Sequence, residues 1–305
     1  MNRKEFFTVA RQTFKEFGKD DVGLLSAGLT YYAFFSVFPL LLLTVSLANL
    51  LLSPEDAMKF VFSTIEQFVP GSAAVLVDAV QNAFDNQESA GWRAIVSLAI
   101  LAYSASGAFS TLDRALNRAW GSEKVPTFVA RKLASFVMML VGAGLLLLSL
   151  VASTLLAYSR SFALEVFGEV RGMQIFWQVA SIGLSLALVF VVFLLVYRYV
   201  PRSDVRLEDV WLSALLAAIA WVLLKEGFAL YLGSQFADYN AIYGTMGTVI
   251  ALLTWIYLSS VIILTGAEFA SETQHVRRLH EVLVEQAMKP QEMKETKETN
   301  SPWFS

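Results

Sequence analysis

Six long runs of apolar residues alternate with polar connections along the chain, and each run is long enough to cross a bilayer as a helix. A spanning helix needs about 20 mostly apolar residues, each rising about 1.5 Å. The runs are continuously apolar and do not alternate with a period of two, which argues against a β-barrel. The pattern predicts an all-α integral membrane protein, a six-transmembrane-helix bundle. The predicted spans are Leu24–Leu52, Ala90–Leu112, Leu133–Tyr158, Met173–Tyr197, Leu207–Leu232 and Met246–Ala270.

An amphipathic N-terminal helix is expected over residues 1–23, before the membrane domain of residues 24–270. Phe6, Ala10, Phe14 and Phe17 share one helical face, and the basic residues lie largely elsewhere. Two interpretations are open. The helix lies at the inner membrane surface, bound by apolar burial and anionic headgroups, or it packs beneath the bundle.

Two further helical segments are expected outside the bilayer. The external connection 53–91 predicts two half-apolar helices, separated by Pro70-Gly71, that cap the bundle or rest on the outer interface. In the C-terminal region 271–305, apolar residues at helical spacing predict a helix over Ser271–Met288. The stretch after Pro290 is polar and rich in charge, which predicts a disordered tail.

Positive charges concentrate in alternate connections, and this asymmetry predicts orientation. Lys and Arg are retained on the cytoplasmic side of a membrane. They are frequent before the first span, after the second, after the fourth and in the C-terminal tail, whereas between Gly233 and Thr245 there are none. Both termini are therefore expected in the cytoplasm. The basic residues of the three internal faces are Arg3, Lys4, Arg11, Lys15 and Lys19, then Arg114, Arg118, Lys124, Arg131 and Lys132, then Arg198, Arg202 and Arg206.

The composition agrees with a membrane protein and excludes cysteine chemistry. Of 305 residues, 56% are hydrophobic and only 16% are charged, whereas soluble domains carry about 25% charged residues. The chain has no cysteines, so disulfides, thiolate catalysis and cysteine-based zinc sites are excluded. The first apolar run is much longer than the 7–15 residues of a signal-peptide core, and we expect it to remain as the first span.

A stripe of polar residues follows one face of the second span and its extension. Ser106, Ser110, Asp113 and Asn117 are spaced by three or four residues and so share a helix face. One interpretation is a water-filled vestibule that descends into the membrane. The other is a helix exit surrounded by ordinary interfacial polar residues.

Three charged residues lie within other predicted spans. Lys225 and Glu226 interrupt the fifth span near its outer end, where a charge costs up to about 2.5–3.5 kcal/mol. Lys225 can extend outward to water, so the shorter Glu226 is the better candidate for lining a cavity. Adjacent helical residues point about 100° apart, so the two need not pair. Glu268 lies near the inner end of the sixth span, nearly a membrane thickness from Lys225.

The connection between the last two spans combines polar and aromatic residues without a cation. Asn240 and Tyr243 are its candidate functional residues. A folded external loop, a shallow re-entrant turn and a plain tight connection all fit this composition.

Several of these motifs together resemble the YihY/BrkB family of bacterial inner-membrane proteins, formerly named ribonuclease BN. The opening motif is Ala27-Gly-Leu-Thr-Tyr-Tyr-Ala-Phe-Phe-Ser-Val-Phe-Pro39. The other matching positions are Asp113, Asn117, Trp120-Gly121, Tyr243-Gly244, Thr254-Trp-Ile-Tyr-Leu258 and Gly266-Ala-Glu268. The resemblance implies six helical spans in a bacterial inner membrane, and it implies no particular reaction or substrate.

The motifs of common enzyme classes are missing from the sequence. His275 and His280 are five residues apart, which is not the i, i+4 spacing of a helical metal pair. There is no phosphate loop ending in Gly-Lys-Ser/Thr, no histidine in the spans to activate Ser104 or Ser106, and no basic, aromatic-rich surface for RNA. We expect no enzymatic activity, no cofactor, no metal and no nucleic-acid partner.

Two functions from different classes fit these features. The first is a transporter that moves a small solute, an ion or a lipid, driven by an ion gradient and using Asp113, Glu226 and Glu268 as carriers. The second is a non-transporting envelope scaffold that binds partners or membrane lipids through its basic faces and peripheral helices. We favour transport. The substrate, the coupling ion and homo-oligomerisation stay open.

Overall fold

The computed structural model describes residues 3–48, 90–122, 155–156, 158–163, 172–232 and 246–299. The long elements in these ranges are helices, and none of the residues described there forms a strand. They are α1 (Arg3–Lys19), α2 (Val22–Ala48), α5 (Ala90–Ala119), α7 (Met173–Tyr199), α8 (Leu207–Leu232) and α10 (Met246–Thr299). Nearly all of the predicted span Leu133–Tyr158, nearly all of the external segment 53–91, and both Asn240 and Tyr243 lie outside the described residues.

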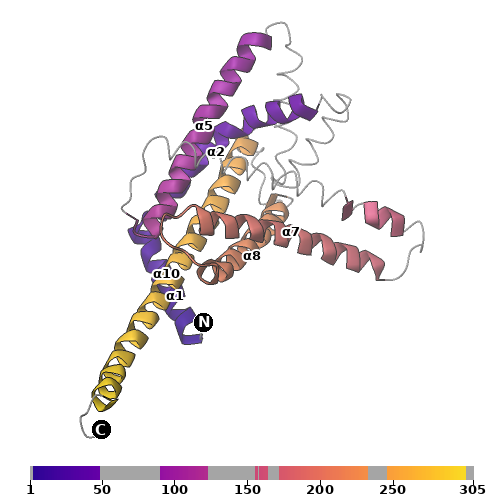
Figure 1. Cartoon of the computed structure of the whole chain (residues 1–305). Coiled ribbons are helices and arrows are strands. Elements are labelled where there is room, and N and C mark those ends of the chain that lie inside the picture. The colour runs from indigo at the N-terminus through magenta and orange to yellow at the C-terminus, as the bar shows by residue number, and fades with distance from the viewer. Residues whose placement is uncertain are drawn as a thin grey trace.

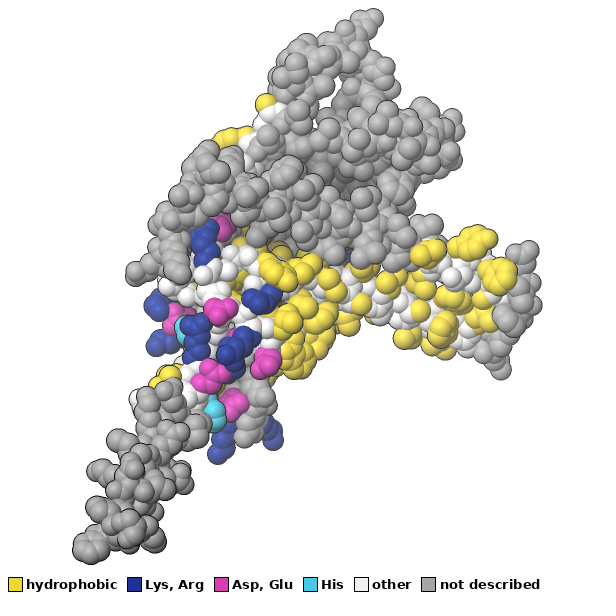
Figure 2. Space-filling model, viewed as in Figure 1, with side chains coloured by type: hydrophobic (Ala, Val, Ile, Leu, Met, Phe, Trp, Pro, Cys, Tyr) yellow, Lys and Arg dark blue, Asp and Glu magenta, His cyan; other side chains and the backbone are white. Residues whose placement is uncertain are grey.

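The observed helices confirm a helical membrane protein. Within the described ranges, three helices are long and apolar enough to cross a bilayer, namely α7, α8 and the part of α10 from Val249 to Leu283. The apolar stretch Val22–Val37 of α2 is shorter. Large apolar side chains of α7 stay exposed along its length and form much of the yellow surface in Figure 2. A helix that is apolar all round suits contact with lipid.

The C-terminal helix is much longer than the predicted span and contradicts the predicted disordered tail. α10 has 54 residues, about 80 Å at 1.5 Å per residue, whereas the hydrocarbon core is about 30 Å thick. The helix continues through Pro290 to Thr299. Proline removes one backbone donor, but the residues after it are mostly Glu, Lys, Met and Gln, which favour helix.

The helices form two pairs that share α10. α2 packs against α5, and α7 packs against α8, while α10 contacts both α2 and α8 and also meets α1 (Figure 1). The C-terminal end of α5, the 200–206 connection between α7 and α8, and residues 264–278 of α10 meet at one place. We call this meeting point the junction. Charged side chains of both signs gather near it in Figure 2.

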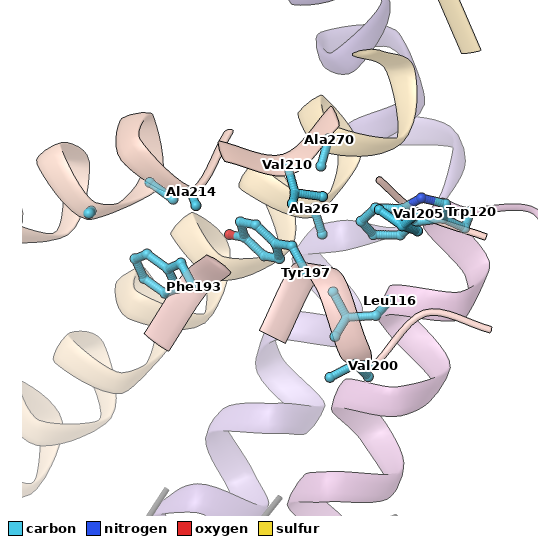
Figure 3. Close-up of a cluster of buried hydrophobic side chains, with 13 residues drawn as sticks. Leu116, Trp120, Phe193, Tyr197, Val200, Val205, Val210, Ala214, Ala267 and Ala270 are labelled. Atoms are coloured by element: carbon cyan, nitrogen blue, oxygen red, sulfur yellow. The ribbon is translucent and has the colours of Figure 1, made fainter. Parts of the chain in front are cut away.

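The main hydrophobic core lies at the junction and is centred on Tyr197. Its labelled members come from α5, α7, α8, α10 and the 200–206 connection (Figure 3). Tyr197 is completely buried, its ring stacks on Phe193 with centroids 5.9 Å apart, and its hydroxyl donates a hydrogen bond of 2.8 Å to the carbonyl of Ile263. A Cβ at Gly266 would collide with the Tyr197 hydroxyl and lie 3.0 Å from the Cβ of Ala217. Glycine at 266 therefore permits the close contact between α7, α8 and α10.

Candidate functional site

The lower half of the polar stripe binds an arginine from the α7–α8 connection. Asp113 and Asn117 lie one turn apart on α5. The Nη2 of Arg202 lies 2.6 Å from both carboxylate oxygens of Asp113, and the main-chain N–H of Arg202 donates to Oδ1 of Asn117 at 2.9 Å. The Nδ2 of Asn117 donates to the carbonyl of Asp113 at 2.8 Å and to its Oδ1 at 3.1 Å. We call these three residues the Asp113 tie.

The Asp113 tie connects the two helix pairs. The Asp113 and Arg202 side chains are only 14% and 24% exposed, so their charges are partly shielded from water and their hydrogen bonds are of the stronger, charge-assisted kind. Ser110 and Ser106 lie about one and two turns further along α5 and are half-buried. The stripe is therefore a continuous polar face of α5, and its lower half is an interhelical contact that neither interpretation of the sequence included.

A second ionic contact holds α10 to the start of α8. The side chain of Asp209 is fully buried, and Arg277 donates to its two oxygens at 2.5 and 2.8 Å. Asp209 is also in the first turn of α8 and accepts the main-chain N–H of Arg206 at 3.1 Å, where the helix dipole favours a negative charge. Close by, Gln274 donates to the carbonyl of Asp204 at 2.6 Å. The middle of α10 is thus bound to the α7–α8 connection.

A third set of contacts holds the α1–α2 turn and α10 to the end of α5. Arg118 donates to Asp20 at 3.3 Å and to Asp21 at 3.2 Å. Asp21 has a φ of 53°, a left-handed conformation in which aspartate is enriched among non-glycine residues. The hydroxyl of Ser271 donates to the carbonyl of Ala119 at 2.6 Å. Polar contacts at the junction therefore join the α1–α2 turn, α5, α10 and the α7–α8 connection.

Glu268 lies inside the junction among other acids. It is only 3% exposed, and the carboxylates of Asp20, Glu16 and Glu272 act on it. A charged carboxylate is costly to bury, and nearby carboxylates add repulsion.

The structure reverses the expected burial of Lys225 and Glu226. Lys225 is 20% exposed and Glu226 is 64% exposed, and the two side chains form an ion pair of 3.4 Å. The packing face of α8 in this region contains Trp221, Leu224 and Phe228. At about 100° per residue, position 225 lies on that face and position 226 turns away from it. The structure therefore places Lys225, and not Glu226, on the packing face of α8.

Sequence reasoning missed the partners in these contacts. Arg202, Arg206 and Arg277 counted only as positive charges for orientation, and Asp209 was not singled out. Asp209 had a local signal, because an acidic residue in the first turn of a helix is a common N-terminal feature. The pairings of Asp113 with Arg202 and of Asp209 with Arg277 join residues 89 and 68 positions apart, and no local pattern indicates them. Among the described residues, no group of three or more His, Cys, Asp or Glu side chains is arranged to hold a metal.

Comparisons with known proteins agree with the resemblance seen in the sequence. The family model described as "Virulence factor BrkB" matches residues 13–292. The ribonuclease-like protein YfkH of Bacillus subtilis is 31% identical over 249 residues, covering 80% of this chain and 86% of YfkH. No solved structure matches the chain.

Two larger relatives carry the name UPF0761 membrane protein. The one from Chlorobium phaeobacteroides is 30% identical over 84% of this chain, and the one from Chromohalobacter salexigens is 31% identical over 88% of it. The matches cover 55% and 63% of these relatives, so they are longer than the shared region. The family match spans most of the chain and the described helices include apolar ones of membrane length, so this chain belongs to the BrkB family of membrane proteins.

Proposed function

We propose that this protein crosses the bacterial inner membrane six times, with both termini in the cytoplasm, and that it transports a small solute, an ion or a lipid. In this arrangement the junction lies at the cytoplasmic side, where the basic connections are retained. The observation that carries the proposal is the Asp113 tie. It joins the α2–α5 pair to the α7–α8 pair at one end of the bundle, through groups that can separate and pair again.

The Asp113 tie is suited to act as a cytoplasmic gate. A hydrogen bond to a charged group contributes about 1.5–3 kcal/mol, which corresponds to a shift of roughly ten- to a hundredfold between closed and open populations. Such a contact is strong enough to hold one state and weak enough to be overcome by binding of a solute or a proton. Glu268, buried in the same junction, is the candidate carrier of the coupling proton or cation. Under this proposal the protein is not an enzyme, and the ribonuclease-like name stays with YfkH.

Transport is tested by loss of solutes from vesicles. Proteoliposomes and protein-free vesicles are loaded with a deproteinised bacterial cytosolic extract, and mass spectrometry follows which solutes or ions escape. We expect at least one compound to leave the proteoliposomes faster. Accumulation of that compound against its gradient, driven by an imposed proton gradient, is expected to be lost in Asp113→Asn. The reason is that the neutral amide no longer holds Arg202.

Two variants make this test specific for the gate. The charge exchange Asp113→Arg/Arg202→Asp should recover part of the accumulation that each single change removes. Arg206→Gln should leave accumulation near the wild-type level, because the side chain of Arg206 pairs with Glu281 where both groups are at least half exposed. Equal escape from both vesicle types for every compound would contradict transport. Normal accumulation in Asp113→Asn would remove the tie from the mechanism.

The C-terminal part of α10 supports the scaffold as a second candidate. Leu279, Val282 and Leu283 share one face of the helix and are 50–64% exposed, while Arg277 and Gln274 face the α7–α8 connection. An unpaired apolar stripe on a helix is a common docking surface for another helix. If the protein is a scaffold, a specific partner should co-purify with the full chain after mild cross-linking, and Leu279→Glu/Leu283→Glu should release it. Recovery of the protein without a partner, for the unaltered chain as well as for the variant, would count against this function.

A further inference from the structure

Helix α1 has two opposite faces, and within the described ranges one of them packs against other helices while the other is exposed. Val9 and Thr13 are buried, and the ring of Phe6 lies 5.7 Å from the ring of Phe269 on α10. These residues form a stripe along α1 that packs against α10. This face therefore contacts the rest of the protein, as the second interpretation of the N-terminal helix requires.

The opposite face is exposed, aromatic and basic. Phe7 and Phe14 are 62% and 78% exposed, and Lys4, Arg11 and Lys15 are exposed beside them. At about 100° per residue, these five side chains occupy one sector of the helix of about 100°. The acids Glu5 and Glu16 fall outside this sector, on the packing side. The exposed face therefore carries positive charge around two large apolar side chains.

An open surface hollow lies at one edge of this face. It has a volume of 670 Å³ and is lined by Phe7, Thr8, Arg11, Gln12 and Lys15. Arg11 and Lys15 are one turn apart, so their cationic ends can reach one anionic group together. Thr8 and Gln12 add polar groups beside them. Among the described residues, neither Arg11 nor Lys15 forms a salt bridge within the protein.

The position of α1 indicates what covers this face. Only Asp20 and Asp21 separate α1 from α2, and α2 is apolar from Val22 onward. The exposed face thus ends at Lys15, seven residues before the apolar helix α2 begins at Val22. Aromatic side chains among cations are the features by which surface helices bind anionic bilayers.

We propose that α1 lies against the anionic leaflet of the membrane. Phe7 and Phe14 insert at the boundary between headgroups and acyl chains, and the hollow between Arg11 and Lys15 holds the phosphate of an anionic phospholipid. The proposal does not depend on transport, because it concerns only the contact of α1 with lipid.

The test measures immersion depth in the full chain. Because the protein has no cysteines, Phe14→Cys provides a single site for a nitroxide spin label. The labelled protein is placed in nanodiscs of phosphatidylcholine alone or of equal parts phosphatidylcholine and phosphatidylglycerol. Collision rates with oxygen, which enriches in lipid, and with a water-soluble nickel chelate then report depth. His280→Cys on the exposed part of α10 is the matched water-exposed control.

We expect the label at position 14 to favour oxygen over nickel, most strongly in the discs that contain phosphatidylglycerol. Each cation near an anionic surface changes partitioning about fivefold. Arg11→Glu/Lys15→Glu should therefore return the label to the nickel accessibility of the control in those discs. A label at Phe7→Cys, in a chain that keeps Phe14, should also favour oxygen over nickel. This second site covers the case in which the loss of Phe14 itself weakens insertion.

Three results would overturn the proposal. The first is nickel accessibility equal to that of the His280→Cys control at both positions in both lipids. The second is immersion that persists in Arg11→Glu/Lys15→Glu. The third is protection from both reagents together with dipolar broadening between labels, which would assign the face to a second copy of the chain.

Discussion

Replacement of Arg277 with alanine is expected to lower the free energy of unfolding by about 3–5 kcal/mol. The change leaves the carboxylate of Asp209 fully buried without its guanidinium partner, and the main-chain N–H of Arg206 remains bonded to it. Removal of one partner from a buried ion pair usually has an effect of about this size, because a charge is left without compensation. Titration with SDS in mixed lipid–detergent micelles measures this free energy.

Arg206→Ala is the control for this prediction. Its side chain pairs with Glu281 where both groups are at least half exposed, and such surface pairs contribute about 0–1 kcal/mol. The double variant Arg277→Met/Asp209→Leu should be more stable than Arg277→Ala, since it removes both charges. Equal effects of Arg277→Ala and Arg206→Ala would show that burial of Asp209 does not govern this contact.

Gly266→Ala is expected to destabilise the protein by about 2–4 kcal/mol. A methyl group at this position meets the hydroxyl of Tyr197 and the Cβ of Ala217. Overpacking of this kind costs about 1–3 kcal/mol, and displacement of Tyr197 also breaks its hydrogen bond to Ile263, which contributes about 1 kcal/mol. The same SDS titration, or the shift in the thermal unfolding midpoint in micelles, reports the loss.

Tyr197→Phe provides the matched cycle, because it removes the colliding hydroxyl. In Gly266→Ala/Tyr197→Phe, the total loss should be clearly smaller than the sum of the two single losses. Gly183→Ala on α7 has open space around it and should be neutral or slightly stabilising, because alanine favours helix. Additive losses in the double variant would place the strain elsewhere.

The bounds of the long apolar helices were predictable, because an apolar run of membrane length forms few structures other than a spanning helix. The predicted span Leu207–Leu232 coincides with α8 at both ends, and α7 begins at the predicted Met173. The end of α10 was not predictable in the same way. After Ala270 apolar residues become less frequent, so helix and disorder are distinguished only by weak residue propensities. Pro290 argued against a helix there.

The candidate site was only partly predictable, because a residue type can be recognised locally whereas its partner cannot. The stripe from Ser106 to Asn117 was identified from helical spacing, but its partner Arg202 comes from a connection 89 positions away. Lys225 and Glu226 show the opposite difficulty. Their chemistry was recognised, yet their burial depended on which face of α8 meets α10, and a helix that is apolar all round does not reveal this.

The sharing of α10 between the two helix pairs has a mechanical consequence. One continuous helix of 54 residues contacts α1, α2, α5, α7 and α8 and is longer than the hydrocarbon is thick. A protein or a lipid surface that tilts the protruding end would therefore move both pairs at once. Force applied at that end would reach both pairs through the helix itself.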